Sequence, residues 1–195
     1  ASDSSWHGTQ TAGLAGAATN NGVGMAGAGR DVRVLPVRAL GKCGGYLSDV
    51  VAAMRWAAGI SSDPVQNPNP ARIINLSLGS SGPCSGSLYE SAVADILAAG
   101  VIIVAAAGND AGLATGKPAN CPGVIGVSGL RHTGSKVGFS NIGPEVSVAA
   151  PGGNCVNTFG QCLFPLLTTI NSGTTSPAAN TYSDGANASI GTSFS

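Results

Sequence analysis

One uninterrupted apolar run, Val-Ile-Ile-Val-Ala-Ala at residues 101–106, constrains the fold of this chain more than any other feature. It follows directly on a helical pattern that begins at a capping-box pair, Ser87 and Glu90, and ends at Gly100. The apolar face of this helix consists of Tyr89, Val93, Ile96 and Leu97. A short apolar run without alternation is typical of a parallel strand that is covered on both faces. The pattern therefore predicts a helix that leads into a buried parallel strand.

Helical and extended patterns alternate along most of the chain. Small apolar residues after His7 predict a first helix, and Ser48 and Gly59 predict the two ends of another, with an apolar face of Val51, Met54 and Ala58. Further strands are predicted at residues 32–38, 73–78, 123–127 and 146–149. This order predicts an α/β fold with a parallel sheet. Beyond residue 151 the sequence is rich in Gly, Thr, Ser and Asn, which predicts loops.

The composition excludes several functional classes. The chain has 195 residues, a length typical of one domain, and 43% of them are hydrophobic, which fits a globular protein. Only 9% are charged and the formal net charge is zero, so we expect no nucleic-acid partner. No apolar run approaches the ~20 residues that a membrane-spanning helix needs. We expect no membrane partner and a monomeric protein.

Five cysteines are present, at positions 43, 84, 121, 155 and 162. They form no Cys-x-x-Cys pair and have no histidine nearby, which disfavours a metal site and favours disulfides formed in an oxidising compartment. Cys43–Cys84 is the preferred pair, because each residue flanks a loop after a neighbouring strand. Cys121 could pair with Cys155 or Cys162, or those two could pair with each other. Because five is an odd number, one cysteine is free or has its partner elsewhere.

Three short motifs follow one another in a fixed order: His7-Gly8-Thr9, Ala107-Gly108-Asn109 and Gly191-Thr192-Ser193. Each is a weak signal alone, since an isolated His or Ser is usually structural and an Asn after Gly is usually a turn residue. Their positions strengthen them: His7 opens a helix, and Asn109 lies where the buried strand ends, the edge at which sites form in α/β sheets. A hydroxyl nucleophile needs a base and oxyanion donors, and His, Asn and Ser supply these parts.

With these motifs, the chain resembles the subtilisin family of serine peptidases over essentially its whole length. The matching blocks are residues 7–9, 34–38, 75–79, 105–109, 139–141, 149–152 and 191–195. Residues 42–46 and 118–122 resemble the branch found in secreted proteases of Gram-negative bacteria. The resemblance implies a three-layer α/β fold with a central, mainly parallel sheet flanked by helices. It also implies a secreted endopeptidase with polypeptide substrates and no cofactor for catalysis.

The resemblance also implies a role for each residue of the site. Ser193 Oγ attacks the scissile carbonyl to form an acyl-enzyme, and His7 accepts its proton and later protonates the leaving amine. Asn109 Nδ2 and the Ser193 backbone N–H hold the oxyanion. The extended substrate pairs as an added strand, and the implied substrate-binding residues are Ser77, Leu78, Gly79, Ala107 and Gly108.

The aspartate of the implied triad has no match in the sequence. The chain has nine acidic residues, and none lies in an Asp-Thr-Gly or Asp-Ser-Gly motif upstream of His7. Asp3 comes closest, but its position four residues before His7 fits a solvated loop residue. The chain also ends two residues after Ser193, before the buried helix that follows the nucleophile in the family. We therefore expect residues 1–195 to form a partial peptidase domain, lacking the N-terminal Asp segment and the C-terminal helix, with little or no activity alone.

Three alternatives compete with this interpretation. A catalytically inactive relative that acts as a binding or interaction module would explain the missing aspartate, although the intact His7, Asn109 and Ser193 oppose it. An α/β-hydrolase esterase is disfavoured because no Gly-x-Ser-x-Gly elbow is present and His precedes Ser. Residues 22–27 match Gly-x-Gly-x-x-Gly, but they follow a predicted helix and precede a strand, the reverse of a dinucleotide site.

The segment around Asn20, Asn21 and Val23 resembles the calcium-binding loop of many family members. Side-chain and backbone oxygens are suitable ligands for a structural Ca²⁺ ion. An ordinary Asn-Gly turn fits the same residues equally well, so the sequence leaves both interpretations open.

Overall fold

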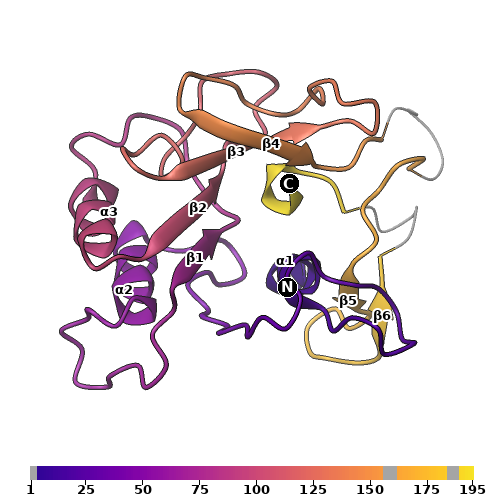
Figure 1. The fold of residues 1–195 in the computed structure, drawn as a ribbon, viewed down its shortest axis with the longest axis horizontal. Coiled ribbons are helices and arrows are strands. Elements are labelled where there is room, and N and C mark those ends of the chain that lie inside the picture. The colour runs from indigo at the N-terminus through magenta and orange to yellow at the C-terminus, as the bar shows by residue number, and fades with distance from the viewer. Residues whose placement is uncertain (1–3, 156–161, 184–188) are drawn as a thin grey trace.

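Four parallel strands form the central sheet of the computed structural model, which describes residues 4–155, 162–183 and 189–195 (Figure 1). The strands β1 (Ile73–Leu76), β2 (Ile102–Ala106), β3 (Ile125–Leu130) and β4 (Val146–Pro151) lie side by side in that order. All three strand pairs are parallel, so the carboxyl ends of the strands lie at one edge. This sheet confirms the predicted α/β class.

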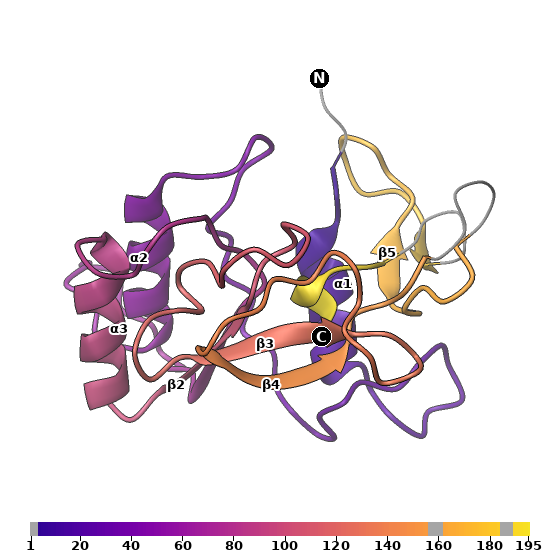
Figure 2. The same ribbon diagram turned by 90° about the horizontal axis from the view of Figure 1, so that it is seen from above.

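Helices α2 (Leu47–Ala57) and α3 (Leu88–Ala98) lie together beside β1 and β2 (Figures 1 and 2). Their buried faces join the inward side chains of these strands in one core, which includes Met54, Ile74, Leu76, Val93, Ile96 and Ile103. Alternate residues point the other way: Ile73 and Ile102 are register partners and are 60% and 47% exposed. Within the described residues, Ile102 is therefore not covered, and the prediction of a strand buried on both faces is wrong there.

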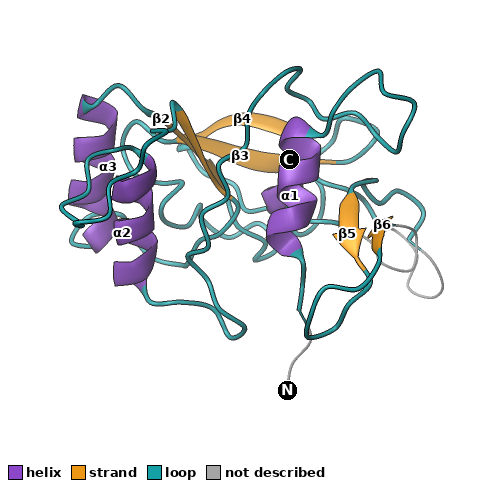
Figure 3. Ribbon diagram, turned by 90° about the horizontal axis from the view of Figure 1, so that it is seen from below, coloured by secondary structure: helices purple, strands orange, loops and turns teal. Residues whose placement is uncertain are grey.

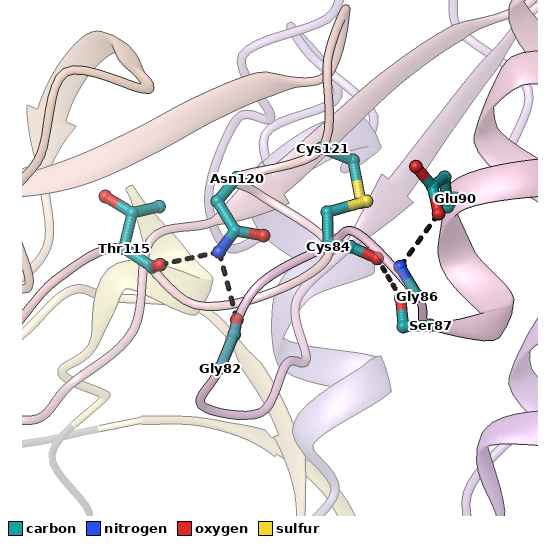
Figure 4. Close-up of a disulfide and its surroundings, with 8 residues drawn as sticks. All are labelled: Gly82, Cys84, Gly86, Ser87, Glu90, Thr115, Asn120 and Cys121. Atoms are coloured by element: carbon teal, nitrogen blue, oxygen red, sulfur yellow. Dashed lines mark hydrogen bonds between the residues drawn. A yellow bond between two sulfur atoms is a disulfide. The ribbon is translucent and has the colours of Figure 1, made fainter.

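The start of α3 differs from the predicted capping box (Figure 4). Ser87 is the N-cap residue, but its Oγ donates to the carbonyl oxygen of Cys84 at 2.6 Å. The Glu90 carboxylate accepts from the Gly86 N–H at 2.8 Å. Both side chains thus stabilise the turn before the helix. The start of α2 also differs, because Tyr46 is its N-cap residue and Ser48 lies within the first turn.

Residues 32–38 do not form the predicted strand. Three valines of this segment, Val32, Val34 and Val37, are between 37% and 49% exposed. A strand exists only where its backbone groups find a neighbouring strand. None of the described segments pairs with residues 32–38, so alternation alone does not make them a strand.

A two-stranded antiparallel sheet, which the sequence did not predict, lies beside α1 (His7–Gly16) (Figure 3). Its strands are β5 (Thr169–Asn171) and β6 (Asn180–Tyr182). The Thr168 hydroxyl, which is fully buried, donates to the carbonyl oxygen of Gln10 at 2.6 Å. The hairpin therefore anchors the helix that begins at the predicted catalytic histidine.

Two disulfides are present, Cys84–Cys121 and Cys155–Cys162, whereas Cys43 is free and exposed. The preferred prediction of a Cys43–Cys84 pair is therefore wrong, and the Cys155–Cys162 alternative is confirmed. The reason is tertiary: the loop after β1 lies along the loop before β3, which brings Cys84 to Cys121.

Candidate active site

His7 is the first residue of α1 and lies half-buried. The N-cap residue Trp6 donates its Nε1–H to the carbonyl oxygen of Gly173 at 2.6 Å, which fixes the start of the helix. The imidazole packs against Phe194, with the ring centroids 5.3 Å apart. Burial lowers the pKa of His7 from its ordinary value of 6.5. The neutral imidazole therefore dominates at pH 7, and this is the form that accepts a proton.

Ser193 lies in a short 3-10 turn, η1 (Thr192–Phe194), that follows Gly191. Gly191 has a φ of 145°, a conformation that disfavours any side chain. The Ser193 hydroxyl donates to the carbonyl oxygen of Ser77 at 3.3 Å, and the Ser77 hydroxyl donates to the Ser193 carbonyl oxygen at 2.8 Å. Ser193 is thus next to Phe194, which touches His7, but its hydroxyl bonds to Ser77.

Asn109 follows β2 at the carboxyl edge of the sheet, and Thr192 holds its amide. The backbone N–H of Thr192 donates to Asn109 Oδ1 at 2.9 Å, and the Thr192 hydroxyl donates to the same oxygen at 3.0 Å. Because two donors meet the oxygen, the amide orientation is defined and Nδ2 is left as the donor. Neither Asn109 Nδ2 nor the Ser193 N–H donates to a partner among the described hydrogen bonds. The two free donors are those that an oxyanion would need.

The predicted substrate-binding residues Ser77, Leu78 and Gly79 follow β1, which is an edge strand of the described sheet. Immediately beyond them, the Ser80 N–H donates to the Lys117 carbonyl oxygen and the Lys117 N–H donates to that of Ser80, both at 2.9 Å. This pairing leaves the backbone of residues 77–79 beside the nucleophile, at the edge of the sheet.

The loops of residues 77–84 and 107–121 are joined further along (Figure 4). Asn120 Nδ2 donates to the carbonyl oxygens of Gly82 and Thr115, both at 3.0 Å, and so connects the two loops. The Cys84–Cys121 disulfide closes the same junction. We call these segments the paired loops; hydrogen bonds and the disulfide join them, and Ser77 of the first loop contacts Ser193.

The other two predicted substrate-binding residues, Ala107 and Gly108, differ in their burial and in the partners of their backbone groups. Ala107 is fully buried, its N–H donates to Val127 and its carbonyl oxygen accepts from Gly116, so its backbone has no free group for a substrate. Gly108 is half-buried, and its N–H donates to the Thr192 hydroxyl at 3.2 Å.

The role of Thr192 was missed by sequence reasoning, although it lies within a recognised motif. Its side chain is 2% exposed, and its hydroxyl accepts from Gly108 while donating to Asn109. A threonine between Gly191 and Ser193 was the only signal available, and it says nothing of partners more than 80 residues away.

No carboxylate contacts His7 in the part of the chain that the structure describes. Asp3 and Asp184 lie outside the described residues. Among those described, no group of three or more His, Cys, Asp or Glu side chains could hold a metal ion, and no helix is long and apolar enough to cross a membrane. In the Asn20–Val23 segment, Asn21 Oδ1 accepts from the Val23 N–H at 3.0 Å, as expected for a turn, and calcium binding stays a prediction.

A family model described as the subtilase family, peptidase S8, matches residues 1–195. The chain belongs to the subtilase family. It is 44% identical to an "Extracellular protease" of Xanthomonas campestris pv. campestris, over 93% of this chain and 30% of that protein. It is also 41% identical to an "Extracellular basic protease" of Dichelobacter nodosus, over 92% of this chain and 28% of that protein.

Solved subtilase structures have the same fold. A protease from Pseudoalteromonas arctica matches with a TM-score of 0.90 and 42% identity, over 99% of this chain and 56% of that one. A cold-adapted subtilisin-like serine proteinase matches with a TM-score of 0.66 and 26% identity, over 96% of this chain and 56% of that one. The chain thus spans less than a third of the two curated relatives and just over half of these solved chains.

Proposed function

We propose that residues 1–195 carry the nucleophile, the general base and the oxyanion donors of a secreted serine endopeptidase. The observation that carries this proposal is the arrangement of Asn109 and Thr192: Thr192, the residue before the nucleophile, holds the Asn109 amide oxygen, and Asn109 Nδ2 has no acceptor among the described residues. Two relatives named as extracellular proteases support secretion and polypeptide substrates.

In this mechanism Ser193 Oγ attacks the scissile carbonyl carbon and His7 accepts its proton. Because the hydroxyl donates to the Ser77 carbonyl oxygen in the structure, it must first turn towards the imidazole. The oxyanion accepts hydrogen bonds from Asn109 Nδ2 and the Ser193 N–H. His7 then protonates the leaving amine, and water hydrolyses the acyl-enzyme by the same steps in reverse order.

A carboxylate from outside the described residues would complete this machinery. It would accept the Nδ1–H of His7, hold the tautomer that presents Nε2 to Ser193, and stabilise the imidazolium that forms. It would also oppose the effect of burial on the pKa of His7. In the triad template the loss of the carboxylate function costs about 10⁴ in kcat.

The substrate would bind as an extended strand along Ser77, Leu78 and Gly79. Added-strand binding takes its affinity from main-chain hydrogen bonds and its selectivity from side-chain pockets. The Cys84–Cys121 disulfide and the Ser80–Lys117 pairing would keep this edge in place while the peptide binds.

Labelling with a fluorophosphonate, followed by peptide mass spectrometry, tests the proposal in the complete natural protein. We expect a stoichiometric adduct on Ser193, no adduct in a Ser193→Ala variant, and normal labelling after Ser135→Ala, which changes an exposed serine on another loop. An absence of both label and peptide hydrolysis would refute the protease proposal and favour an inactive relative that binds other proteins. The 195-residue chain is expected to label far more slowly than the complete protein.

A further inference from the structure

Asn141 is a buried amide that binds the segment carrying Asn109. Its side chain is 1% exposed. The Asn141 N–H donates to the carbonyl oxygen of Gly108 at 2.9 Å, and Asn141 Oδ1 accepts from the Asp110 N–H at 2.7 Å. The residues immediately before and after Asn109 are therefore both bound to this one residue.

The amide nitrogen of Asn141 strengthens the same connection. Asn141 Nδ2 donates to the Asp110 carboxylate at 2.9 Å and to the carbonyl oxygen of Ala114 at 3.2 Å. With the two bonds above, Asn141 makes four hydrogen bonds to residues 108–114. A buried amide with its groups satisfied has one low-energy orientation, so it holds its partners in one geometry.

The segment that carries Asn141 is itself held in place. The Lys136 ammonium group donates to three backbone carbonyl oxygens of the following turn, those of Val137, Gly138 and Ser140, at 2.9, 3.3 and 3.2 Å. The Ser140 hydroxyl accepts from the Gly129 N–H of β3 at 2.9 Å, which ties the turn to the sheet. Asn141 therefore connects the rigid sheet with the loop of the oxyanion donor.

Gly108 shows how closely Asn141 approaches this loop. Its φ is 115°, and a Cβ atom at this position would collide with Asn141 Nδ2. Thr192 separately holds the Asn109 side chain through its amide oxygen. The orientation of the Asn109 amide is thus held by Thr192, and the position of the backbone on either side of Asn109 is held by Asn141.

We propose that Asn141 is a positioning residue for the oxyanion donor: its four hydrogen bonds to residues 108–114 fix the backbone from which Asn109 reaches the substrate. This inference rests on the oxyanion role of Asn109 in the proposed function. A donor displaced by a fraction of an ångström still permits substrate binding but stabilises the oxyanion less. The effect should therefore fall on kcat and leave KM nearly unchanged.

The first test compares Asn141→Ala with Asn67→Ala in the complete natural protein. Asn67 is a matched control because it is also buried, at 8% exposed, and makes three hydrogen bonds, to Trp56 and Ala57 at the C-terminal end of α2 and to Asn69 in the following loop. Both variants should lose stability, but only Asn141→Ala should lower kcat, by about 10- to 100-fold per active site titrated. This is below the ~10²–10³ measured in a subtilisin for complete loss of the Asn donor. Equal kcat values for Asn141→Ala and the unsubstituted protein would overturn the proposal.

A double-mutant cycle separates positioning from general destabilisation. In an Asn109→Ala background, Asn141→Ala should have little further effect on kcat, because the donor that it positions is already gone. A drop of the same size in both backgrounds would show that Asn141 acts independently of Asn109 and would overturn the proposal.

Asn141→Asp offers a second variant of the same shape in case the alanine variant does not fold. It keeps the acceptor for the Asp110 N–H but places a carboxylate against the Asp110 carboxylate, so kcat should fall. Adding Asp110→Asn restores a hydrogen bond between the two side chains, now donated by position 110 and accepted by position 141. This second substitution should recover part of the lost kcat, and no recovery would count against the proposal. An unsubstituted protein that neither labels nor hydrolyses peptides would refute the proposed function itself, which is a distinct outcome.

Discussion

Removal of the Cys84–Cys121 disulfide should destabilise the protein more than removal of Cys155–Cys162. The two bonds join residues 37 and 7 positions apart. The loop-closure entropy that each removes from the unfolded chain corresponds to about 4 kcal/mol and about 2.5 kcal/mol at 25 °C. The first pair is also buried, at 5% and 3% exposed, so truncation to alanine adds a packing loss in the same direction.

The assay is thermal unfolding of two double variants, Cys84→Ala/Cys121→Ala and Cys155→Ala/Cys162→Ala, in a Ser193→Ala background that prevents self-digestion. A difference of about 1.5 kcal/mol corresponds to about 3–6 °C in Tm for a domain of this size. Replacing both cysteines of a pair avoids leaving a single unpaired thiol that could form a wrong disulfide with the free Cys43. Equal Tm values, or a larger loss for the 155–162 pair, would refute the reasoning from loop length.

The same variants test the role of the paired loops in substrate binding. With Ser193 intact, loss of the Cys84–Cys121 bond should raise KM for peptide substrates severalfold, because residues 77–79 are no longer held against the loop of residues 107–121. The Cys155→Ala/Cys162→Ala variant serves as the control and should keep its KM. An unchanged KM in both would show that the Ser80–Lys117 pairing and Asn120 hold the loops without the disulfide.

Three further predictions concern the site itself. Since burial lowers the pKa of His7, its NMR titration midpoint in the 195-residue chain should lie below 6.5. A carboxylate that contacts His7 in the complete protein should raise this midpoint. A midpoint above 6.5 in the 195-residue chain would contradict the structure. Gly108→Ala should cost more than 1 kcal/mol of stability and lower kcat, because the new Cβ would collide with Asn141. Gly134 has a φ of 83° and open space around it, so Gly134→Ala should show only the backbone cost. Equal losses of stability in the two variants would exclude the clash with Asn141. Thr192→Val should lower the free energy of unfolding by about 2 kcal/mol and reduce kcat about tenfold, because it removes the hydroxyl bonds to Gly108 and Asn109. Thr192→Ser keeps the hydroxyl and should retain most activity. Similar kcat values for the two variants would show that these hydroxyl bonds do not affect catalysis.

The α/β class and the positions of most elements were predictable because they depend on short-range patterns. The helix of residues 88–98 and the strand of residues 102–106 are visible as a period of 3.6 residues followed by a continuous apolar run. The segment of residues 32–38 shows the limit of such patterns, since its alternation predicted a strand but no described neighbour pairs with it. The hairpin of β5 and β6 was missed because its strands are three residues long and carry no clear alternation.

The motifs and their order are readable from the sequence alone, because His7, Asn109 and Ser193 are each recognisable from a few neighbouring residues. Which distant groups meet depends on the fold of the whole chain. The fold pairs Cys84 with Cys121 and not with Cys43, and it brings the Ser193 hydroxyl to the Ser77 carbonyl oxygen. It also brings Asn141 into contact with the two residues on either side of Asn109. The physical reason is that helical and strand periodicity arises from neighbouring residues, whereas the partners of buried polar groups depend on the path of the whole chain.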